Sequence, residues 1–303
     1  MILLTALDFR KSIPVFAIAF NQQQYKTYIL SDEHAQSRLE VVPERGGIIT
    51  SWRVQSEDIL YLDAERFTKP DLSVRGGIPI LFPICGNLPD NSYRSKDQQY
   101  TLKQHGFARD LPWEVTEQVT QDKASITLVL NSNEHTRAVY PFDFQLAFTY
   151  ELKGNTLELE QRYTNHSAEA MPFSTGLHPY FWTPDKTKLQ FEIPASEYLD
   201  QLTHTNHPFT GGFDFSSDEI DVAFLSLSGN SATVTDPERQ LQITLSYDNN
   251  YSTLVFWTVK GKDFYCLEPW SAARNALNTG LNLLHVEPGA SLETRVRLTA
   301  NFL

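Results

Sequence analysis

Apolar and polar residues alternate with a period of two through most of this chain, and this alternation restricts the possible folds more than any other feature of the sequence. Every second residue is apolar in the segments 126–130, 144–152, 241–247 and 296–302. Such alternation buries one face of a β-strand and leaves the other face in water. The Gly154-Asn155 pair, which follows one of these segments, predicts a hairpin turn.

Helical periodicity is confined to short stretches. The segments 63–67 and 272–278 are the best candidates, and each is long enough for a turn or two only. Segments 82–104 and 202–219 show no strand pattern, and we expect long loops there, which often carry function. We therefore predict an all-β fold, a large antiparallel β-sandwich, as a single domain that spans residues 1–303.

The composition is that of a globular protein with an acidic surface. Of 303 residues, 41% are hydrophobic and 20% are charged, which is enough for a large core. There are 25 Lys and Arg against 37 Asp and Glu, so the formal net charge is −12. Such a surface repels nucleic acid and anionic membranes, and we expect neither as a partner. A few converging arginines can still bind a small anionic substrate.

The N-terminal segment lacks the pattern of a signal peptide. Its apolar residues 1–7 follow no basic region and are interrupted by charged residues, and the apolar stretch 13–20 is too short to cross a bilayer. The two cysteines are too few for a disulfide framework. We therefore expect a protein of the reducing cytoplasm.

Two glycine-containing segments carry candidate binding residues. In Arg75-Gly76-Gly77 the glycines permit a bend or a close approach that a side chain would block, so we expect Arg75 to project from a tightly bent backbone. In the second segment His105 and Arg109 lie four residues apart around a glycine, which can place two donors on one concave surface. The alternatives are a surface arginine at a turn and a structural histidine.

His178 lies between Leu177 and a proline that is followed by three aromatic residues. The proline biases His178 toward an extended backbone, so we expect it in a strand or at a strand end. An imidazole has an ordinary pKa close to neutral pH and can supply a proton there. The alternative is an interior histidine that is hydrogen-bonded to a carbonyl group.

Glu268 lies within an apolar and aromatic segment, Phe264 to Trp270, which has a strand pattern. Burial disfavours a charged carboxylate and raises its pKa. A carboxylate in such a place needs a reason, and a role as general base is one. The alternative is a buried salt bridge, to Arg75 or to Arg109.

Together these segments resemble the aldose 1-epimerase (mutarotase) family, and in particular its branch of hexose-6-phosphate mutarotases. The resemblance rests on four sequence words in the family's order, and two weaker ones extend it from about residue 40 to the end of the chain. The words are RGGIPILFP (75–83), QHGFARD (104–110), GLHPYF (176–181) and LEPW (267–270), with ERGGIITSWR (44–53) and VEPGAS (286–291) in support. The resemblance implies a galactose mutarotase-like β-supersandwich with an open cleft.

The resemblance also implies a role for each matching residue. Glu268 matches the general base that takes the proton from the anomeric hydroxyl, and His178 matches the general acid that protonates the ring oxygen. His105 and Arg75 match polar groups that hold the sugar, and Arg109 matches a substrate-binding residue of the phosphosugar branch. The two arginines can clamp a phosphate, hydrogen-bond a neutral sugar or brace the general base, and the sequence leaves these three roles open.

One aspartate completes the implied site. Asp221 matches the family aspartate that accepts hydrogen bonds from sugar hydroxyls. Asp214 and Asp218 are nearby competitors, and a solvated loop carboxylate is the alternative.

The implied activity is interconversion of the α and β anomers of a hexose or hexose 6-phosphate, and this reaction needs only one base and one acid. The sequence has no P-loop, no dinucleotide fingerprint and no HExxH motif, so we expect no cofactor and no metal. One alternative is a non-catalytic carbohydrate-binding or sugar-sensing protein on the same fold, which would not require the acid–base pair. Another is a metalloenzyme in which His105, His178 and Glu268 bind the metal.

Overall fold

The computed structural model describes residues 15–303, and it confirms the predicted all-β fold. Nearly all its strands pair with antiparallel neighbours in two large sheets and three smaller ones. Residues 1–14, and with them the prediction about a signal peptide, lie outside the described part. The described part of the apolar stretch 13–20 belongs mostly to the first strand, β1 (Phe16–Gln22).

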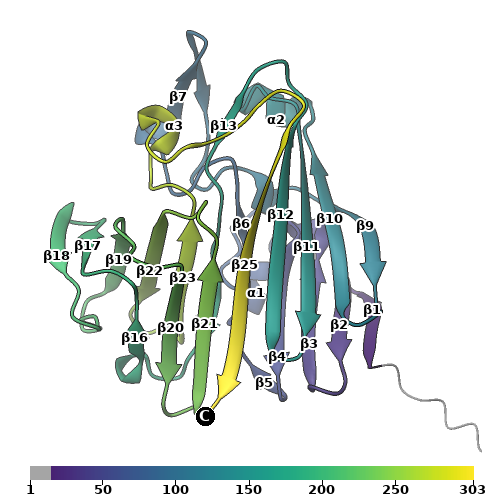
Figure 1. The fold of residues 1–303 in the computed structure, drawn as a ribbon, viewed down its shortest axis with the longest axis vertical. Coiled ribbons are helices and arrows are strands. Elements are labelled where there is room, and N and C mark those ends of the chain that lie inside the picture. Colours follow the sequence, from purple (N-terminus) through teal and green to yellow (C-terminus); the bar gives the residue numbers. More distant parts are fainter. Residues whose placement is uncertain (1–14) are drawn as a thin grey trace, which may run out of the picture.

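The first large sheet, here called the β12 sheet, faces the viewer in Figure 1. All four alternating segments predicted from the sequence lie in its strands, and the turn at Gly154 joins two of these strands. Its strands, in spatial order, are β16 (Gln190–Glu192), β20 (Ser231–Asp236), β21 (Leu241–Tyr247), β25 (Ser291–Phe302), β12 (Thr156–Asn165), β11 (Phe144–Lys153), β10 (Ala124–Asn131) and β9 (Glu114–Val119).

The second large sheet, the β23 sheet, carries Asp221 and Glu268, and His178 lies between two of its strands. Its strands, in spatial order, are β18 (Thr205–Pro208), β17 (Glu197–Asp200), β19 (Glu219–Phe224), β22 (Thr253–Val259), β23 (Phe264–Trp270), β14 (Gly176–Leu177) and β6 (Ile80–Leu81), and β15 (Tyr180–Trp182) also pairs with β23. Because β23 is central, the residues of its LEPW segment have strands on both sides.

The β3 sheet consists of β1, β2 (Lys26–Asp32), β3 (Ser37–Val42), β4 (Ile48–Val54) and β5 (Glu57–Asp58), and it packs behind β10 and β11 (Figure 1). Isolated bridges from Ile49 to Ile78 and from Leu60 to Phe181 join it to the segments of the β23 sheet. The two small sheets pair β7 (Ser92–Ser95) with β8 (Gln98–Thr101) and β13 (Met171–Phe173) with β24 (Leu284–Val286).

The helices are short. Two of them, α1 (Ala64–Phe67) and α3 (Ala276–Thr279), fall in or beside the predicted segments, and α2 (Glu134–Val139) was not predicted. The 3-10 turns are Pro43–Arg45, Pro89–Asn91, Ala108–Asp110 and Lys186–Lys188. Across residues 15–303 no helix has both the length and the apolar character needed to cross a membrane.

The two long-loop predictions need correction. Segment 82–104 contains the β7–β8 hairpin, which projects beside α3 at the end of the molecule opposite the C-terminus (Figure 1). Segment 202–219 contains β18, which pairs with β17. Both strands of the first hairpin and β18 are mostly polar, and β8 and β18 are also mostly exposed, so hydrophobic periodicity gives no signal for them.

A single apolar cluster runs between the sheets from Tyr28 to Ala300. Phe82 is fully buried near its centre, and its ring lies 5.2 Å from that of Phe144 and 5.4 Å from that of Phe173. Full burial of one such side chain contributes about 1.5–3 kcal/mol to the hydrophobic stabilisation. The segment after Phe82 is thereby anchored in the core before it reaches the site.

Candidate active site

The central strands of the β23 sheet place a row of side chains on the face that points away from the main core. Because side chains alternate along β23, Leu267 enters the core whereas Glu268 faces the opposite side. Asp221 of β19 lies opposite Trp257 of β22, and Val255 of β22 lies opposite Glu268. Residues far apart in the sequence therefore meet on one surface.

This surface is the floor of a polar cavity of about 290 Å³. That volume is at the lower end of the range for small-molecule sites. All six residues that the sequence assigned to the site line the cavity, and their individual roles stay predictions. The lining residues are Arg66, Ser73, Val74, Arg75, Gln104, His105, Arg109, His178, Tyr180, Glu219, Asp221, Val255, Trp257, Glu268, Trp270 and Arg274.

A carboxylate and an imidazole meet in this cavity. Oε1 of Glu268 lies 3.3 Å from Nε2 of His178, and Oε2 accepts a hydrogen bond of 3.0 Å from the indole nitrogen of Trp270. The Glu268 side chain is 1% exposed. Burial, assisted by the negative charge of Asp221, raises the pKa of Glu268 well above its ordinary value. The carboxyl group therefore holds a proton far more strongly than a solvated glutamate does.

His178 lies between β14 and β15, at a strand end as expected. Its ring stacks on that of Tyr180 at 4.7 Å and meets Trp257 edge-on at 5.8 Å. Burial and the positive charge of Arg109 lower the pKa of His178 to about 3. The ring is thus neutral at neutral pH when the site is empty, which differs from the ordinary histidine pKa assumed from the sequence.

His105 is held by the backbone of the segment after Phe82. Its Nδ1 accepts a hydrogen bond of 3.1 Å from the amide of Gly86, and its own amide donates to the Gly86 oxygen at 2.7 Å. Because Nδ1 is an acceptor, the ring proton of the neutral form belongs on Nε2. The His105 ring lies 5.5 Å from that of His178 and 5.6 Å from that of Trp270.

Arg75 reaches the cavity from a segment whose backbone requires glycine. Gly76 has a φ of 132° and Gly77 a φ of 63°, and a Cβ atom on Gly77 would lie 2.2 Å from the Ile49 oxygen. The amide of Tyr180 donates a hydrogen bond of 2.9 Å to the Gly77 oxygen and so joins this segment to β15. The tight bend expected from the sequence is confirmed.

Neither Arg75 nor Arg109 forms an ion pair within residues 15–303. Arg109 donates from Nη2 to the Gln104 oxygen at 2.9 Å, whereas its buried Nε has no protein partner in the same part of the chain. Arg75 lies 5.8 Å from the ring centre of Trp257. The alternative of a buried salt bridge from either arginine to Glu268 is therefore not observed.

Among the three candidate aspartates, only Asp221 lines the cavity. Its Oδ2 forms an ion pair of 2.7 Å with Nη2 of Arg274, and its Oδ1 accepts a hydrogen bond of 2.7 Å from Nε2 of Gln201. Asp214 caps the local turn at Ser216, and Asp218 pairs at the surface with a lysine.

Two residues of this arrangement, Arg274 and Gln201, were not identified from the sequence. Trp270 belongs to the LEPW segment, and it shares the face of Glu268 because it lies two residues further along the same strand. Arg274 follows soon after in an irregular segment and carried no motif. Gln201 comes from the β17–β18 turn, and nothing in the local sequence links it to a site.

A different set of residues lies closest to a metal-binding geometry. Within residues 15–303 the potential ligand atoms of His178, Cys266 and Glu268 lie within 4.8 Å of one another, whereas the sequence had suggested His105 in place of the cysteine. Metals bind the thiolate form of cysteine. Burial and the nearby Glu268 raise the pKa of Cys266 well above its ordinary value, so in the empty site the thiol is protonated at neutral pH and a metal ion would have to displace this proton.

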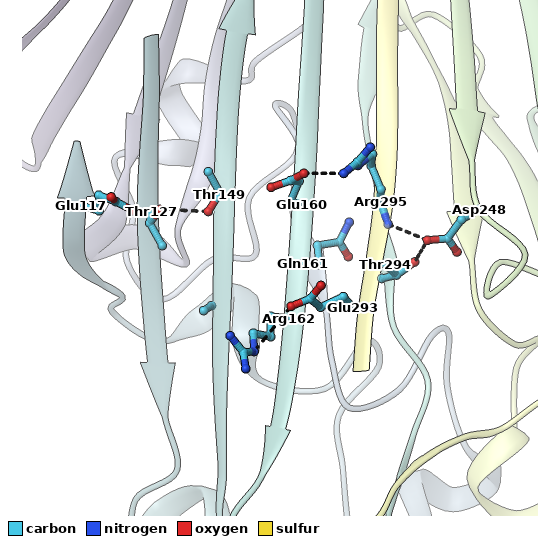
Figure 2. Close-up of a pocket in the computed structure, with 11 residues that line it drawn as sticks. Glu117, Thr127, Thr149, Glu160, Gln161, Arg162, Asp248, Glu293, Thr294 and Arg295 are labelled. Carbon is cyan, nitrogen blue, oxygen red and sulfur yellow. Dashed lines mark hydrogen bonds and ion pairs between the residues drawn. The ribbon is translucent and has the colours of Figure 1, made fainter. Parts of the chain in front are cut away.

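A larger hollow, of about 520 Å³, lies on the β12 sheet (Figure 2). Its polar side chains are mostly paired with one another: Glu160 with Arg295 at 2.6 Å, Arg162 with Glu293 at 3.7 Å, and the hydroxyls of Thr127 and Thr149 at 2.9 Å. The chemistry of the smaller cavity, not its size, marks it as the candidate active site.

The antiparallel β-sandwich and its polar cavity define a protein of the galactose mutarotase-like class. Over residues 28–299 the sequence matches the family described as aldose 1-epimerase. The chain belongs to the aldose 1-epimerase family, whose activity is that of a sugar isomerase.

Individual relatives agree with this assignment. The Slr1438 protein of Synechocystis sp. PCC 6803 is 49% identical, with a TM-score of 0.91 over 95% of this chain and 99% of that one. A galactose mutarotase-like protein of Clostridium acetobutylicum is 21% identical, with a TM-score of 0.82 over 95% and 99% of the two chains, and this likeness shows the fold. A protein of Cenchrus ciliaris named "Putative glucose-6-phosphate 1-epimerase" is 27% identical over 84% of this chain and 79% of its own length.

Proposed function

We propose that this protein is an aldose 1-epimerase that interconverts the α and β anomers of a hexose or hexose 6-phosphate, with Glu268 and His178 as its catalytic residues and with no cofactor. The observation that carries the proposal is the 3.3 Å contact between these two side chains in a polar cavity of about 290 Å³. Mutarotation needs a base at O1 and an acid at O5, and both oxygens are bonded to C1. Two groups in contact can therefore serve both oxygens.

The pair performs the reaction while holding one mobile proton. In the charged arrangement, Glu268 takes the proton from O1, the C1–O5 bond breaks as C1–O1 becomes a carbonyl, and protonated His178 delivers its proton to O5. The pair is then neutral, with the proton on Glu268. After rotation about C1–C2 the steps reverse on the other face of the carbonyl, so the proton count is restored.

Binding of the sugar favours the arrangement that starts ring opening. In the empty site burial raises the pKa of Glu268 and lowers that of His178 to about 3, which favours the neutral arrangement. A sugar that places O1 against the carboxylate and O5 against the imidazolium gives each charged form a hydrogen-bond partner. His105, with its Nε2 proton toward the cavity side of the ring, is suited to hold the same oxygens.

We further propose that the preferred substrate carries a phosphate. Arg75 and Arg109 line the cavity without a carboxylate partner within residues 15–303, and a guanidinium group matches phosphate geometry. The name of the Cenchrus ciliaris relative points to the same substrate class. An unpaired cationic rim on a chain of net charge −12 is the feature that supports an anionic ligand.

The acid–base pair is tested by replacing each member with a neutral residue of similar shape. Glu268→Gln and His178→Asn should each slow anomer exchange about 10²–10⁴-fold while sugar binding persists, because the proton transfers are lost and the shape is kept. Exchange is measured by NMR at equilibrium, with the buffer rate subtracted. A wild-type rate equal to the buffer rate, with binding intact, would instead favour the carbohydrate-binding alternative. Loss of wild-type activity on chelation would indicate a metal.

The phosphate is tested with two substrates. Arg75→Gln and Arg109→Gln should lower kcat/KM for glucose 6-phosphate about 10-fold to 100-fold, since each removes a charge-assisted hydrogen bond. Glucose, which lacks the phosphate, should be affected several-fold at most. Equal losses for both sugars would show that the arginines hold the sugar ring or brace the site and do not bind phosphate.

A further inference from the structure

Arg274 uses its whole guanidinium group within the site, and each of its nitrogens contacts a different segment of the chain. Nη2 donates to Asp221 of β19 at 2.7 Å, Nε donates to Gln201 of the β17–β18 turn at 2.5 Å, and Nη1 donates to Asn87 of the segment before β7 at 2.9 Å. Of these three segments only β19 lines the cavity, so Arg274 ties this strand to two segments outside the cavity. A planar guanidinium group, with its donors in fixed directions, can join three segments at one point, here called the Arg274 junction. A lysine ammonium group cannot do so.

The Arg274 junction, together with Gln201, fixes the orientation of the Asp221 carboxylate. Both carboxylate oxygens of Asp221 have protein partners, Arg274 and Gln201, and Gln201 does not itself line the cavity. Each carboxylate oxygen has a second lone pair. The remaining acceptor positions of Asp221 are therefore held in one direction, as hydrogen-bond acceptors for sugar hydroxyls must be.

The stem of Arg274 extends the junction to the acid–base side of the cavity. It packs on Gly86, where a Cβ atom would lie 2.3 Å from Cγ of Arg274. The same Gly86 peptide exchanges two hydrogen bonds with His105. Arg274 therefore connects the residue expected to bind sugar hydroxyls, Asp221, with a histidine that contacts the ring of His178.

We propose that Arg274 is a positioning residue that holds Asp221 in its sugar-binding geometry and so determines which arrangement of sugar hydroxyls the cavity accepts. The proposal rests on the proposed function, because it takes Asp221 as the acceptor for those hydroxyls. Arg274 is also neutralised by Asp221, which leaves Arg66, Arg75 and Arg109 as lining arginines without a carboxylate partner within residues 15–303.

The test is a double-mutant cycle between Arg274 and Asp221. Arg274→Met should raise KM for glucose about 10-fold to 100-fold and change kcat several-fold at most, because sugar binding is affected and the acid–base pair is intact. In an Asp221→Ala background the same change should alter KM by less than about 3-fold, since its target is gone. Arg274→Lys should restore only part of the loss.

Substrate specificity provides a second measurement, which should not change if Arg274 has only a structural role. The ratio of kcat/KM for glucose and galactose, which differ in one hydroxyl configuration, should approach one in Arg274→Met. The matched control is Arg239→Lys, another half-buried arginine, which contacts backbone oxygens of Trp182 and Asp58 outside the cavity. It should leave KM and the sugar ratio unchanged.

Two results would overturn the proposal: a KM effect of Arg274→Met that is undiminished in the Asp221→Ala background, or a fall in kcat with unchanged KM. To separate this outcome from failure of the proposed function, glucose binding is also measured by NMR titration in a Glu268→Gln background. The wild type could show no anomer exchange while glucose binding still depends on Arg274 only when Asp221 is present. This result would reject mutarotation but would retain the positioning role of Arg274.

Discussion

Glu268 shows how a single residue can be held in a state that is unfavourable in water. Its carboxyl group is 1% exposed, and its neighbours offer one indole N–H and one imidazole but no cation in ion-pair contact. The structure therefore favours the protonated acid in the empty site, and the ionised form that acts as base is the costly one. This cost is a property of the folded state and should appear in its stability.

The pH dependence of stability tests this directly. Because the folded pKa of Glu268 lies above its unfolded value near 4.5, the wild type loses stability as pH rises from 4.5 through the folded pKa. Glu268→Gln lacks this titration. The free energy of unfolding of the variant relative to the wild type should therefore increase by up to about 1.4 kcal/mol per pH unit in that window.

Urea unfolding at several pH values between 5 and 8 measures this difference, and histidines that do not contact Glu268 cancel in it. A constant difference across the range would contradict burial as the cause of the raised pKa. His178 contributes with the opposite sign: its folded pKa of about 3 lies below the unfolded value, so its stabilisation is lost as pH falls below about 6.5.

At the scale of elements, two kinds of burial made strands recognisable in the sequence. The hairpin at Gly154 shows alternation because one face of each of its strands is buried, whereas the strand that carries Glu268 is buried on both faces and is marked by its run of apolar and aromatic residues. The β7–β8 hairpin escaped prediction because its residues are almost all polar. Tyr93 and Tyr100, which pair across it and stack at 5.5 Å, are its only apolar signal.

The bend after Arg75 yields a prediction for an element. Gly77→Ala should lose clearly more stability than Gly154→Ala, although the two glycines have nearly the same φ, 63° and 62°. The left-handed conformation costs about 1–2 kcal/mol for alanine at either position. At Gly77 the new Cβ would also meet the Ile49 oxygen at 2.2 Å, whereas nothing lies within 4 Å at Gly154.

The comparison is made by urea unfolding of both variants, and Gly154→Ala is the control for backbone strain alone. We expect the loss at Gly77 to be at least twice the loss at Gly154. Equal losses would mean that the close approach to Ile49 relaxes without cost and that the second glycine of the pair serves only to set the backbone angle.

At the scale of the whole molecule, the sequence predicted which residues belong to the candidate site but not how they contact one another. Motif words located His178 and Glu268, yet their contact depends on how β14, β15 and β23 pair, and no local pattern specifies that pairing. The contact between Arg274 and Gln201 could not be predicted either, because it joins two irregular segments that lie 73 positions apart in the sequence. Periodicity encodes which face is buried, and tertiary packing decides which faces meet.

The same reasoning predicts that the larger hollow on the β12 sheet has no part in the reaction. Its Arg162–Glu293 pair is 3.7 Å long with side chains 57% and 74% exposed, so it contributes about 1 kcal/mol or less to stability. The double variant Arg162→Gln, Glu293→Gln should therefore unfold close to the wild type and retain its full rate of anomer exchange. A tenfold loss of kcat/KM with normal stability would contradict this, and would mean that the hollow is linked to the sugar cavity through the sandwich. We expect no such link. Within residues 15–303 the buried polar chain that leaves the hollow runs from Gln161 through Tyr163 to Thr175, and it ends at the backbone oxygen of Leu81 without reaching Glu268.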